Sequence, residues 1–477
     1  MNEKIEENSV SQQHSSGLQR SLKNRHLQLI AIGGAIGTGL FMGSGRTISL
    51  AGPSVLFTYM IIGFFLFFVM RAMGELLLHN LEYKSFVDFS ADILGPTMGY
   101  FLGWSYWFCW VVIGIADIVA ITGYTQFWWP DVPLWLPGLA CIVFLLVFNL
   151  LSAKLFGELE FWFALVKIVA IVALILVGAY LLITRFVGPT GDTASLSHLW
   201  DRGGMFPNGI TGFFAAFQIA IFAFVGIELV GTASAETADP AKNLPKAINK
   251  IPVRVIVFYV LALTAIMTVT PWDVVAPNKS PFVNMFLLIG IGAAAAIINF
   301  VVLTSALSSA NSGMFSTGRM LYGLSKNKLA PESFGKLSRN GTPRNGLIYS
   351  CALLLCGIFL LYAEGDVMRA FTIVTTVASI CFIFVWAVIL ISYLKYRRIR
   401  PHAHAASSYK MPFAIPMCYA TLAFFVFALY LFSQEEETLI GLIATPFWFL
   451  ALFLFLPFYK KRLKQASTLN MAAQTAR

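Results

Sequence analysis

The sequence is short of charged residues. Asp, Glu, Lys and Arg make up 12% of the 477 residues, whereas a soluble globular protein carries roughly 25%. Hydrophobic residues make up 58%, and the mean hydropathy is +0.75. A chain of this size has no core large enough to hide so much apolar surface. The scarcity of charge therefore excludes a soluble protein and indicates that the lipid bilayer is its solvent.

Other marks are missing as well. The first 26 residues are polar and hold no apolar h-region, so we expect no cleavable signal peptide. No P-loop of the form G-x-x-x-x-G-K-[ST] is present, which excludes the usual ATP-driven machinery. The six cysteines lie in or next to apolar segments without the company of metal ligands, and we interpret them as packing residues: Cys109, Cys141, Cys351, Cys356, Cys381 and Cys418.

Long segments free of Asp, Glu, Lys and Arg fill most of the chain. A spanning helix needs about 20 apolar residues, and backbone groups in lipid must be satisfied within the helix. The segments predict an all-α integral membrane protein with tails at 1–26 and 463–477 and a membrane domain at 27–462. We expect twelve spans, whose charge-free parts lie at 27–45, 47–70, 99–116, 132–153, 168–184, 203–227, 255–272, 282–318, 345–363, 370–394, 411–434 and 438–459.

The net charge of +10 follows the predicted topology. With twelve spans and a cytoplasmic N-terminus, only five of the 33 Lys and Arg fall in outside loops, namely Arg46, Arg185, Arg202, Lys279 and Arg369. Apart from Lys167, all others lie in the tails and inside loops, as the positive-inside rule requires. The basic clusters therefore indicate orientation rather than nucleic-acid binding, and both termini are expected in the cytoplasm.

Three ionisable residues are predicted to lie well inside the spans: Asp117, Lys167 and Glu228. A charge at the bilayer centre costs several kcal/mol on insertion scales, so its presence there indicates a function. Buried charges of this kind are typical of transport proteins, in which they line a substrate or ion pathway.

Two spans carry residues that favour an interruption. Span 1 reads IAIGGAIGTGLFMGSG, and span 6 has Gly226 and Glu228 near its middle. Close helix packing is the alternative in span 1, because Gly39 and Gly43 form a GxxxG pattern. The two candidate breaks lie five spans apart, so equivalent spans run in opposite directions. Interrupted segments at matching positions of two inverted halves predict a transporter site, with spans 1–5 and 6–10 as repeats.

An interrupted helix exposes N–H groups at one broken end and carbonyls at the other, which suit an anion and an ammonium group respectively. Two such helices side by side fit a zwitterion, and a free α-amino acid is the obvious match. We expect N–H groups of Gly37, Thr38 and Gly39 to hold the carboxylate. The carbonyls expected to take the ammonium group belong to Ala35, Phe222 and Val225.

Long stretches resemble the amino acid transporter family of the amino acid–polyamine–organocation superfamily. They include HLQLIAIGGAIGTGLFMGSGRTISLAGPS, MGELLLHNLEYKSF and FAFVGIELVGTASAETADPAKNLPKAI, and the likeness covers about 22–461. Within that family, NLEYKSF, WFCWVV, INFVVLTSA and TPFWF resemble bacterial permeases for glycine, D-alanine and D-serine. The resemblance implies a LeuT-like fold of five plus five inverted spans with two more, and proton-coupled uptake across the bacterial inner membrane. It also implies that the span 1 glycines hold the carboxylate.

Lys167 is expected to replace the sodium ion of sodium-coupled relatives, because a buried ammonium group changes its protonation readily. Similar transporters carry a lysine there, and Ser308 and Ser309 are expected beside it. The alternative is a lysine that snorkels to the cytoplasmic face. The physics of the sequence leaves proton and sodium coupling open, and Lys167 tips the choice to protons.

The remaining candidates have two interpretations each. Glu228 either caps the interrupted backbone or takes part in gating or proton relay. Glu236 belongs to an inner-gate ion pair or to a plain solvated loop. Trp110 faces the pocket by superfamily alignment, where it would restrict the substrate to a small side chain, or it packs in the core or against lipid. Asp117 pairs with a polar group or faces the outer vestibule, and no role is assigned to it.

The function expected is a secondary symporter that imports glycine, D-alanine and D-serine with protons. The same fold for another neutral amino acid, such as proline, stays open. A membrane-embedded enzyme would show a cluster of Asp, His or Arg in its loops, and the outside loops hold scattered charges and only His198. A channel would show a continuous polar lining, and a sensor would add a soluble domain. We expect no cofactor, no metal and no obligate protein partner beyond substrate and lipid.

Overall fold

The computed structural model describes residues 36–83, 85–151, 153–188, 191–232, 239–288, 290, 292–338 and 341–475. All regular elements in these residues are helices, apart from an isolated bridge between Val187 and Thr193. The fold class expected from the low charge and the long apolar segments, all-α, is confirmed.

The longer helices are α5 Val55–His79, α7 Pro96–Thr125, α8 Trp135–Leu151, α9 Ala153–Ile183, α17 Gly292–Lys326, α20 Val367–Ile399, α22 Ala414–Phe432 and α23 Glu436–Thr475. The shorter ones are α3 Thr38–Phe41, α4 Gly43–Ala51, α6 Phe86–Leu94, α10 Gly209–Ala215, α11 Phe217–Phe222, α12 Leu229–Thr232, α13 Pro240–Asn249, α14 Ile251–Arg254, α15 Ala262–Val269, α16 Pro281–Leu288, α18 Arg344–Leu353, α19 Leu355–Glu364 and α21 Pro401–Ala406. A π-helical segment, η4 Val255–Leu261, joins α14 to α15, and 3₁₀ turns occur at η1 Gly52–Ser54, η2 Leu196–Leu199, η5 Trp272–Val274 and η6 Glu332–Gly335.

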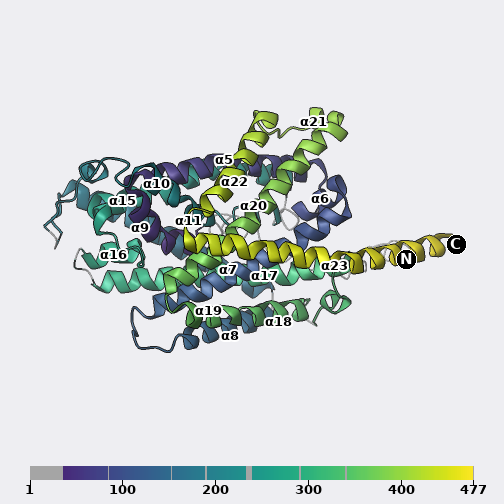
Figure 1. Cartoon of the computed structure of the whole chain (residues 1–477), viewed down its shortest axis with the longest axis horizontal. Coiled ribbons are helices and arrows are strands. Elements are labelled where there is room, and N and C mark those ends of the chain that lie inside the picture. Colours follow the sequence, from purple (N-terminus) through teal and green to yellow (C-terminus); the bar gives the residue numbers. More distant parts are fainter. Residues whose placement is uncertain are drawn as a thin grey trace, which may run out of the picture.

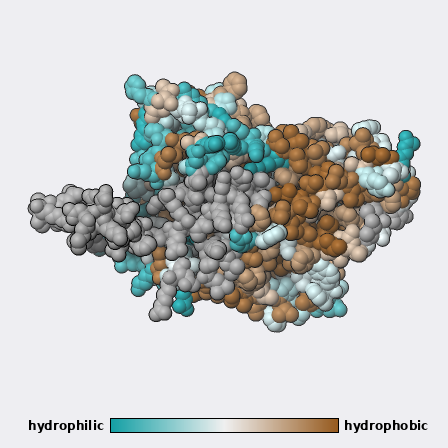
Figure 2. All heavy atoms as spheres, turned by 180° about the vertical axis from the view of Figure 1, so that it is seen from behind, coloured by the Kyte–Doolittle hydropathy of each residue, from teal (hydrophilic) through white to brown (hydrophobic). Residues whose placement is uncertain are grey.

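Within the described part of the chain, nine helical runs are long and apolar enough to cross a membrane. Two shorter apolar helical runs, Trp135–Leu150 and Gly209–Phe222, fall where spans 4 and 6 are expected. The space-filling view shows a broad apolar region between hydrophilic surfaces at both ends of the molecule (Figure 2). The chain is therefore a multi-pass membrane protein.

The long helix α7 lies within the bundle, where it packs along α17 and α20 (Figure 1). Helix α9 packs against α15 and α17. At one end of the bundle lie α6 and α21, and at the other lie α10, α15 and α16 (Figure 1). We call the first the basic end, because Arg71, Lys326 and Arg400 lie there.

One predicted span boundary is wrong. The sequence analysis divides spans 1 and 2 at Arg46, but α4 continues past it and the chain turns at Gly52 and Pro53, where Gly52 has a φ of 59°. Arg46 is tolerated within the helix because its guanidinium pairs with Glu437 at 2.7 Å. Span 5 is expected to contain Lys167, and α9, which begins at Ala153, does hold Lys167 in its interior.

Two further buried carboxylates escape the sequence analysis, which counts only Asp117, Lys167 and Glu228 inside the spans. Glu160 of α9 is 1% exposed, and Glu75 of α5 is fully buried. The sequence analysis places both in connections or near segment ends, because each charge-free segment stops at the nearest charged residue. A helix carries a charge well into the protein when neighbouring helices supply hydrogen bonds, and the sequence alone does not show those partners.

An exposed ion pair joins α6 to the end of α20 at the basic end. Arg400 donates to Asp92 at 2.8 Å and to the hydroxyl of Tyr83 at 3.3 Å. The hydrogen bond from Tyr83 and the guanidinium of Arg400 hold the pKa of Asp92 below its ordinary value. The carboxylate is therefore ionised at neutral pH and the pair stays formed.

Glu75 ties three elements together at the same end. Its carboxylate accepts hydrogen bonds from the Tyr393 hydroxyl at 2.7 Å and the Met411 N–H at 2.9 Å, and its other oxygen lies 2.5 Å from His404 Nδ1. We expect Glu75→Ala to lower the free energy of unfolding by about 3–5 kcal/mol, because it leaves buried donors without an acceptor. Thermal unfolding in detergent measures this. The control Glu82→Ala, at an exposed position, should change little, and an equal loss in both variants would contradict the assignment.

Candidate functional site

The described part of span 1 begins with non-helical backbone. Ile36 and Gly37 precede α3, and Gly37 is extended with φ −129° and ψ −163°. The first intrahelical donors are the N–H groups of Leu40 and Phe41, which both point to the Gly37 carbonyl. The N–H groups of Thr38 and Gly39 therefore come before the first helical hydrogen bond, as at any helix start.

Span 6 is interrupted between α11 and α12. Residues 223–228 form turns, and Gly226 has a φ of +95°, a conformation that glycine adopts at little cost. The Tyr259 hydroxyl of η4 donates to the Ala223 carbonyl at 2.7 Å, and the Tyr259 ring stacks on Phe224 with centroids 4.8 Å apart. The interruption predicted for this span is present, and a neighbouring helix holds it in place.

The start of α3 lies against the turn of span 6. A Cβ built on Gly39 would stand 2.6 Å from the Ala223 Cα and 2.9 Å from the Phe222 ring, so only glycine fits between the two backbones. A Cβ built on Gly43 would likewise collide with the side chain of Ile219. The close-packing interpretation of these two glycines is therefore confirmed. Gly37 differs, because the nearest atom to a Cβ built there is Ser309 Oγ at 3.8 Å.

Lys167 reaches from α9 to the backbone just before Gly37. Its Nζ donates to the Ile36 carbonyl at 3.2 Å and to Ser308 Oγ at 3.0 Å, and the side chain is 1% exposed. Ser305 Oγ donates to the same carbonyl at 3.3 Å. The snorkelling alternative is wrong, because the ammonium group points into the bundle and away from the lipid headgroups.

Asp117 of α7 lies on the other side of the same segment. Its Oδ1 accepts a hydrogen bond from Thr38 Oγ1 at 2.8 Å, and the carboxylate faces Ser309 of α17. Asp117 and Lys167 lie close enough to interact electrostatically. The two ionisable side chains thus flank the start of α3, and Thr38 and Ser309 complete the polar surroundings of Gly37.

Glu228 uses both carboxylate oxygens within the bundle. Oε2 accepts from the Gly226 N–H at 3.2 Å, and Oε1 accepts from the Tyr106 hydroxyl of α7 at 3.2 Å. The side chain is fully buried. This carboxylate therefore closes the turn of span 6 and joins it to α7.

The model of the family described as amino acid permease matches residues 26–467. The chain belongs to the amino acid permease family. It is 63% identical over 435 residues to the D-serine/D-alanine/glycine transporter of Escherichia coli strain K12, covering 91% of this chain and 93% of that protein. It is 53% identical over 91% of its length to the amino-acid permease AapA of Bacillus subtilis, of which 94% is covered. The DL-alanine permease SerP2 of Lactococcus lactis is 42% identical, with 93% of this chain and 96% of that protein aligned.

The family resemblance is thereby confirmed, and the chain is an amino acid permease, since its family and relatives are permeases and transporters rather than enzymes. The alternatives of a membrane-embedded enzyme, a channel or a sensor are set aside on the same finding. The residues discussed here are accordingly those of a permease.

Trp110 lies inside the permease bundle. It is 3% exposed, stands edge-on to Phe382 of α20 with centroids 6.2 Å apart, and packs against Gly313 of α17. Phe222 stands edge-on to Phe371 of α20 at 5.8 Å. These contacts exclude the lipid-facing alternative for Trp110 and place it among the helices that surround the interrupted segments.

Two predicted site residues, Ala35 and Glu236, lie outside the described residues. The sequence analysis does not predict four hydrogen bonds of this region. They join Tyr259 to Ala223, Tyr106 to Glu228, Ser305 to Ile36, and Ser308 to Glu160. Tyrosine and serine are ordinary in membrane helices, so nothing in their spacing singles them out. Glu160 could have been found from the sequence, because it lies seven residues before Lys167 and therefore on the same face of that helix.

The contacts of Glu228 predict the outcome of two substitutions in this permease. We expect Glu228→Gln to keep most of the amino acid uptake, because the amide oxygen still accepts from Gly226 and its NH₂ group donates to Tyr106. Glu228→Leu should lose most uptake, since it leaves two buried donors unsatisfied. Uptake of labelled glycine into cells, normalised to the amount of protein in the membrane, measures both. Loss of uptake in the glutamine variant would instead favour a titrating role.

Proposed function

We propose that this permease imports glycine, D-alanine and D-serine together with protons across the bacterial inner membrane. The 63% identity to a protein named D-serine/D-alanine/glycine transporter supports this substrate class. The sidedness of the basic residues supports a cytoplasmic basic end with both termini inside. The proton gradient is the only energy source proposed, and neither a cofactor nor a protein partner is needed.

The fold that we propose is the LeuT-like one, with twelve spans, repeats at spans 1–5 and 6–10, and spans 11 and 12 added outside. The transporter domain then comprises 27–462, between tails at 1–26 and 463–477. Non-helical backbone before α3 and between α11 and α12 supports this arrangement, because the two segments are five expected spans apart and Gly39, at the start of α3, contacts Ala223 in the second.

The substrate carboxylate is proposed to bind the N–H groups of Gly37, Thr38 and Gly39, which precede the first helical hydrogen bond. The ammonium group then faces the carbonyls of Ala35, Phe222 and Val225. Gly37 supports this geometry, since a Cβ there would only touch Ser309 Oγ at 3.8 Å, whereas a Cβ at Gly39 would collide with Ala223. Trp110 is proposed to limit the side chain to that of glycine, alanine or serine.

One contact supports proton coupling most directly. Lys167 donates to the carbonyl of Ile36, the residue next to Gly37, so a proton on Lys167 holds the backbone at the edge of the proposed substrate site. Asp117 lies beside Thr38, and a second carboxylate arriving there is repelled unless a proton is present nearby. A proton on Lys167 or Asp117 therefore favours substrate binding, and the bound substrate favours the proton. Reciprocal binding of this kind is the thermodynamic content of symport.

Purified protein in liposomes tests the proposal. An imposed inward proton gradient should drive accumulation of labelled glycine, and an imposed sodium gradient at equal pH should not. D-alanine and D-serine should compete with glycine, whereas L-proline should leave its uptake unchanged. Accumulation driven by sodium would contradict the coupling ion, and competition by L-proline alone would contradict the substrate class.

A further inference from the structure

A series of buried polar groups leads from Lys167 to Glu160. Lys167 Nζ donates to Ser308 Oγ at 3.0 Å, and Ser308 Oγ donates to Glu160 Oε1 at 2.7 Å. Glu160 is 1% exposed and precedes Lys167 by about two turns on α9. The Ser308 hydroxyl therefore accepts from the cation and donates to the carboxylate, which is the arrangement that a proton transfer requires.

The series continues beyond Glu160 through amide and hydroxyl groups. Glu160 faces Asn311 and Ser312 of α17, and Asn149 Nδ2 of α8 donates to Asn311 Oδ1 at 2.9 Å. In the described part of the chain, four buried atoms of this cluster lack a hydrogen bond of good geometry: Glu160 Oε2, Asn311 Nδ2, Ser312 Oγ and Asn149 Oδ1. Glu160, Asn311 and Ser312 face one another, so the carboxylate lies within a polar cluster rather than in apolar surroundings.

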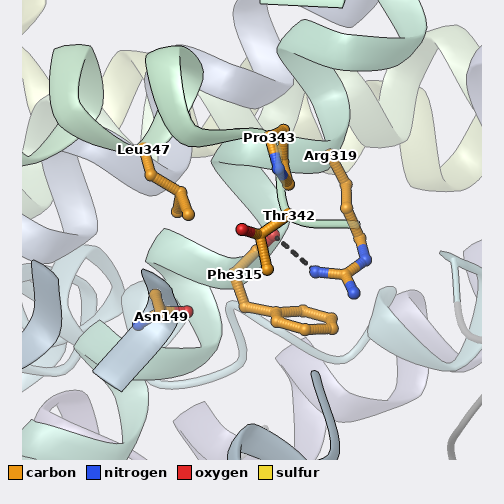
Figure 3. A pocket seen from close by; sticks show the side chains of 6 residues that line it. All are labelled: Asn149, Phe315, Arg319, Thr342, Pro343 and Leu347. Carbon is orange, nitrogen blue, oxygen red and sulfur yellow. Dashed lines mark hydrogen bonds between the residues drawn. The ribbon is translucent and has the colours of Figure 1, made fainter. Parts of the chain in front are cut away.

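Asn149 also lines a small pocket with a volume of about 10 Å³, together with Phe315, Arg319, Thr342, Pro343 and Leu347 (Figure 3). In this view Asn149 lies on one side of the pocket, and the half-buried Arg319 lies on the other, donating to the Phe315 carbonyl. Ser308 and Arg319 are separated by about 16 Å along α17, which continues to Lys326 at the basic end. The polar groups thus extend from the middle of the bundle toward that end.

We propose that Glu160 accepts the coupled proton from Lys167 through Ser308, and that the Asn311–Ser312–Asn149 cluster and its pocket form the proton exit to the cytoplasm. The proposal rests on the proton coupling proposed above. In the transfer, an N–H bond of Lys167 breaks as the Ser308 oxygen gains that proton. The original Ser308 O–H bond breaks and a Glu160 O–H bond forms. An ammonium–carboxylate pair thereby becomes an amine and a carboxylic acid.

Burial favours this direction of transfer, because two buried charged groups become two neutral ones. Among the described residues, Asp117 on α7 also interacts with Lys167 and favours its charged form, so burial must outweigh that attraction. A single uncompensated charge is costly in this environment, whereas the transfer converts a net-neutral pair into another net-neutral pair. Neutral Lys167 is also a weaker donor to the Ile36 carbonyl, so the proton that leaves loosens the backbone next to Gly37.

The first experiment compares Glu160→Gln with the control Glu332→Gln, which makes the same chemical change at an exposed position paired with Lys328. Glycine accumulation under a proton gradient should fall roughly tenfold or more in Glu160→Gln. Glycine exchange across liposomes without a gradient needs no net proton movement and should be retained. Glu332→Gln should match the native protein in both assays.

Three outcomes would overturn the proposal. Undiminished accumulation by Glu160→Gln excludes a proton acceptor at this position, and loss of exchange as well as accumulation indicates a structural role. If the native protein itself ignores the proton gradient, the proposed function fails and this inference fails with it.

Ser308→Ala should reproduce the Glu160→Gln result while Ser308→Thr, which restores the hydroxyl, should recover accumulation. Equal accumulation in the alanine and threonine variants would exclude the relay through Ser308.

The exit is tested separately with Asn149→Leu, with Asn327→Leu at an exposed position near the end of α17 as its control. Removal of the Asn149 amide should lower the maximal rate of proton-driven glycine uptake and leave the KM for glycine unchanged. The slowing should be greater in D₂O than for the native protein. A native rate and a native solvent isotope effect in Asn149→Leu would overturn the exit route.

Discussion

Gly37→Val should abolish glycine uptake while the protein still inserts and folds. The nearest atom to a Cβ at this position is 3.8 Å away, and the extended backbone of Gly37 is one that valine adopts readily. The added methyl groups would occupy the space beside the N–H groups of Thr38 and Gly39, so we expect a loss of at least about a hundredfold in uptake. Labelled glycine uptake and thermal unfolding, measured on the same preparation, separate the loss of binding from the loss of fold.

Gly323→Val is the matched control, because nothing lies within 4 Å of a Cβ built at Gly323 on α17. It should transport normally. Gly39→Ala is a poor substitute for the test, since its Cβ would stand 2.6 Å from the backbone of Ala223 and any loss would reflect disturbed packing. Normal uptake by Gly37→Val would rule out a carboxylate site on this segment.

Lys167→Ala should eliminate proton-driven accumulation of glycine and retain glycine exchange at saturating glycine, with a higher KM. The substitution removes the ammonium group that donates to the Ile36 carbonyl and to Ser308, and with it the group proposed to carry the proton. We expect the accumulation ratio in liposomes to fall to about one, which corresponds to the loss of all coupling. Simultaneous recording of the internal pH and of labelled glycine measures the ratio.

Lys167→Arg sharpens the test. Arginine keeps the positive charge and the donors but does not lose its proton in proteins. It should therefore bind glycine and fail to accumulate it, as Lys167→Ala does. Uphill uptake by either variant would remove Lys167 from the coupling mechanism.

The position of the interruption in span 6 is the part of the fold that the sequence predicts best. Gly226 and its neighbours predict the turn in span 6, because glycine alone relieves the strain of a φ near +95°. Span boundaries are less predictable. A charged residue such as Arg46 looks like the end of a helix until its partner Glu437, almost 400 residues away, is known.

The candidate site is likewise only partly predictable from the sequence. Lys167 and Asp117 stand out from the sequence because a charge within an apolar segment is rare. Their partners do not: Thr38, Ser308 and the carbonyl of Ile36 become partners only when α3, α7, α9 and α17 are brought together. Glu160 is an example, since its hydrogen-bond donor is a serine 148 positions later in the chain.

The contact between Gly39 and Ala223 has a consequence for redesign. Because two main chains touch there without an intervening side chain, neither segment is free to shift alone. A library intended to change which amino acid is carried should therefore leave both strips of backbone untouched. Variation belongs on the side chains nearby, at Trp110 of α7 and Phe371 of α20, where a side chain shrinks or grows without disturbing this contact.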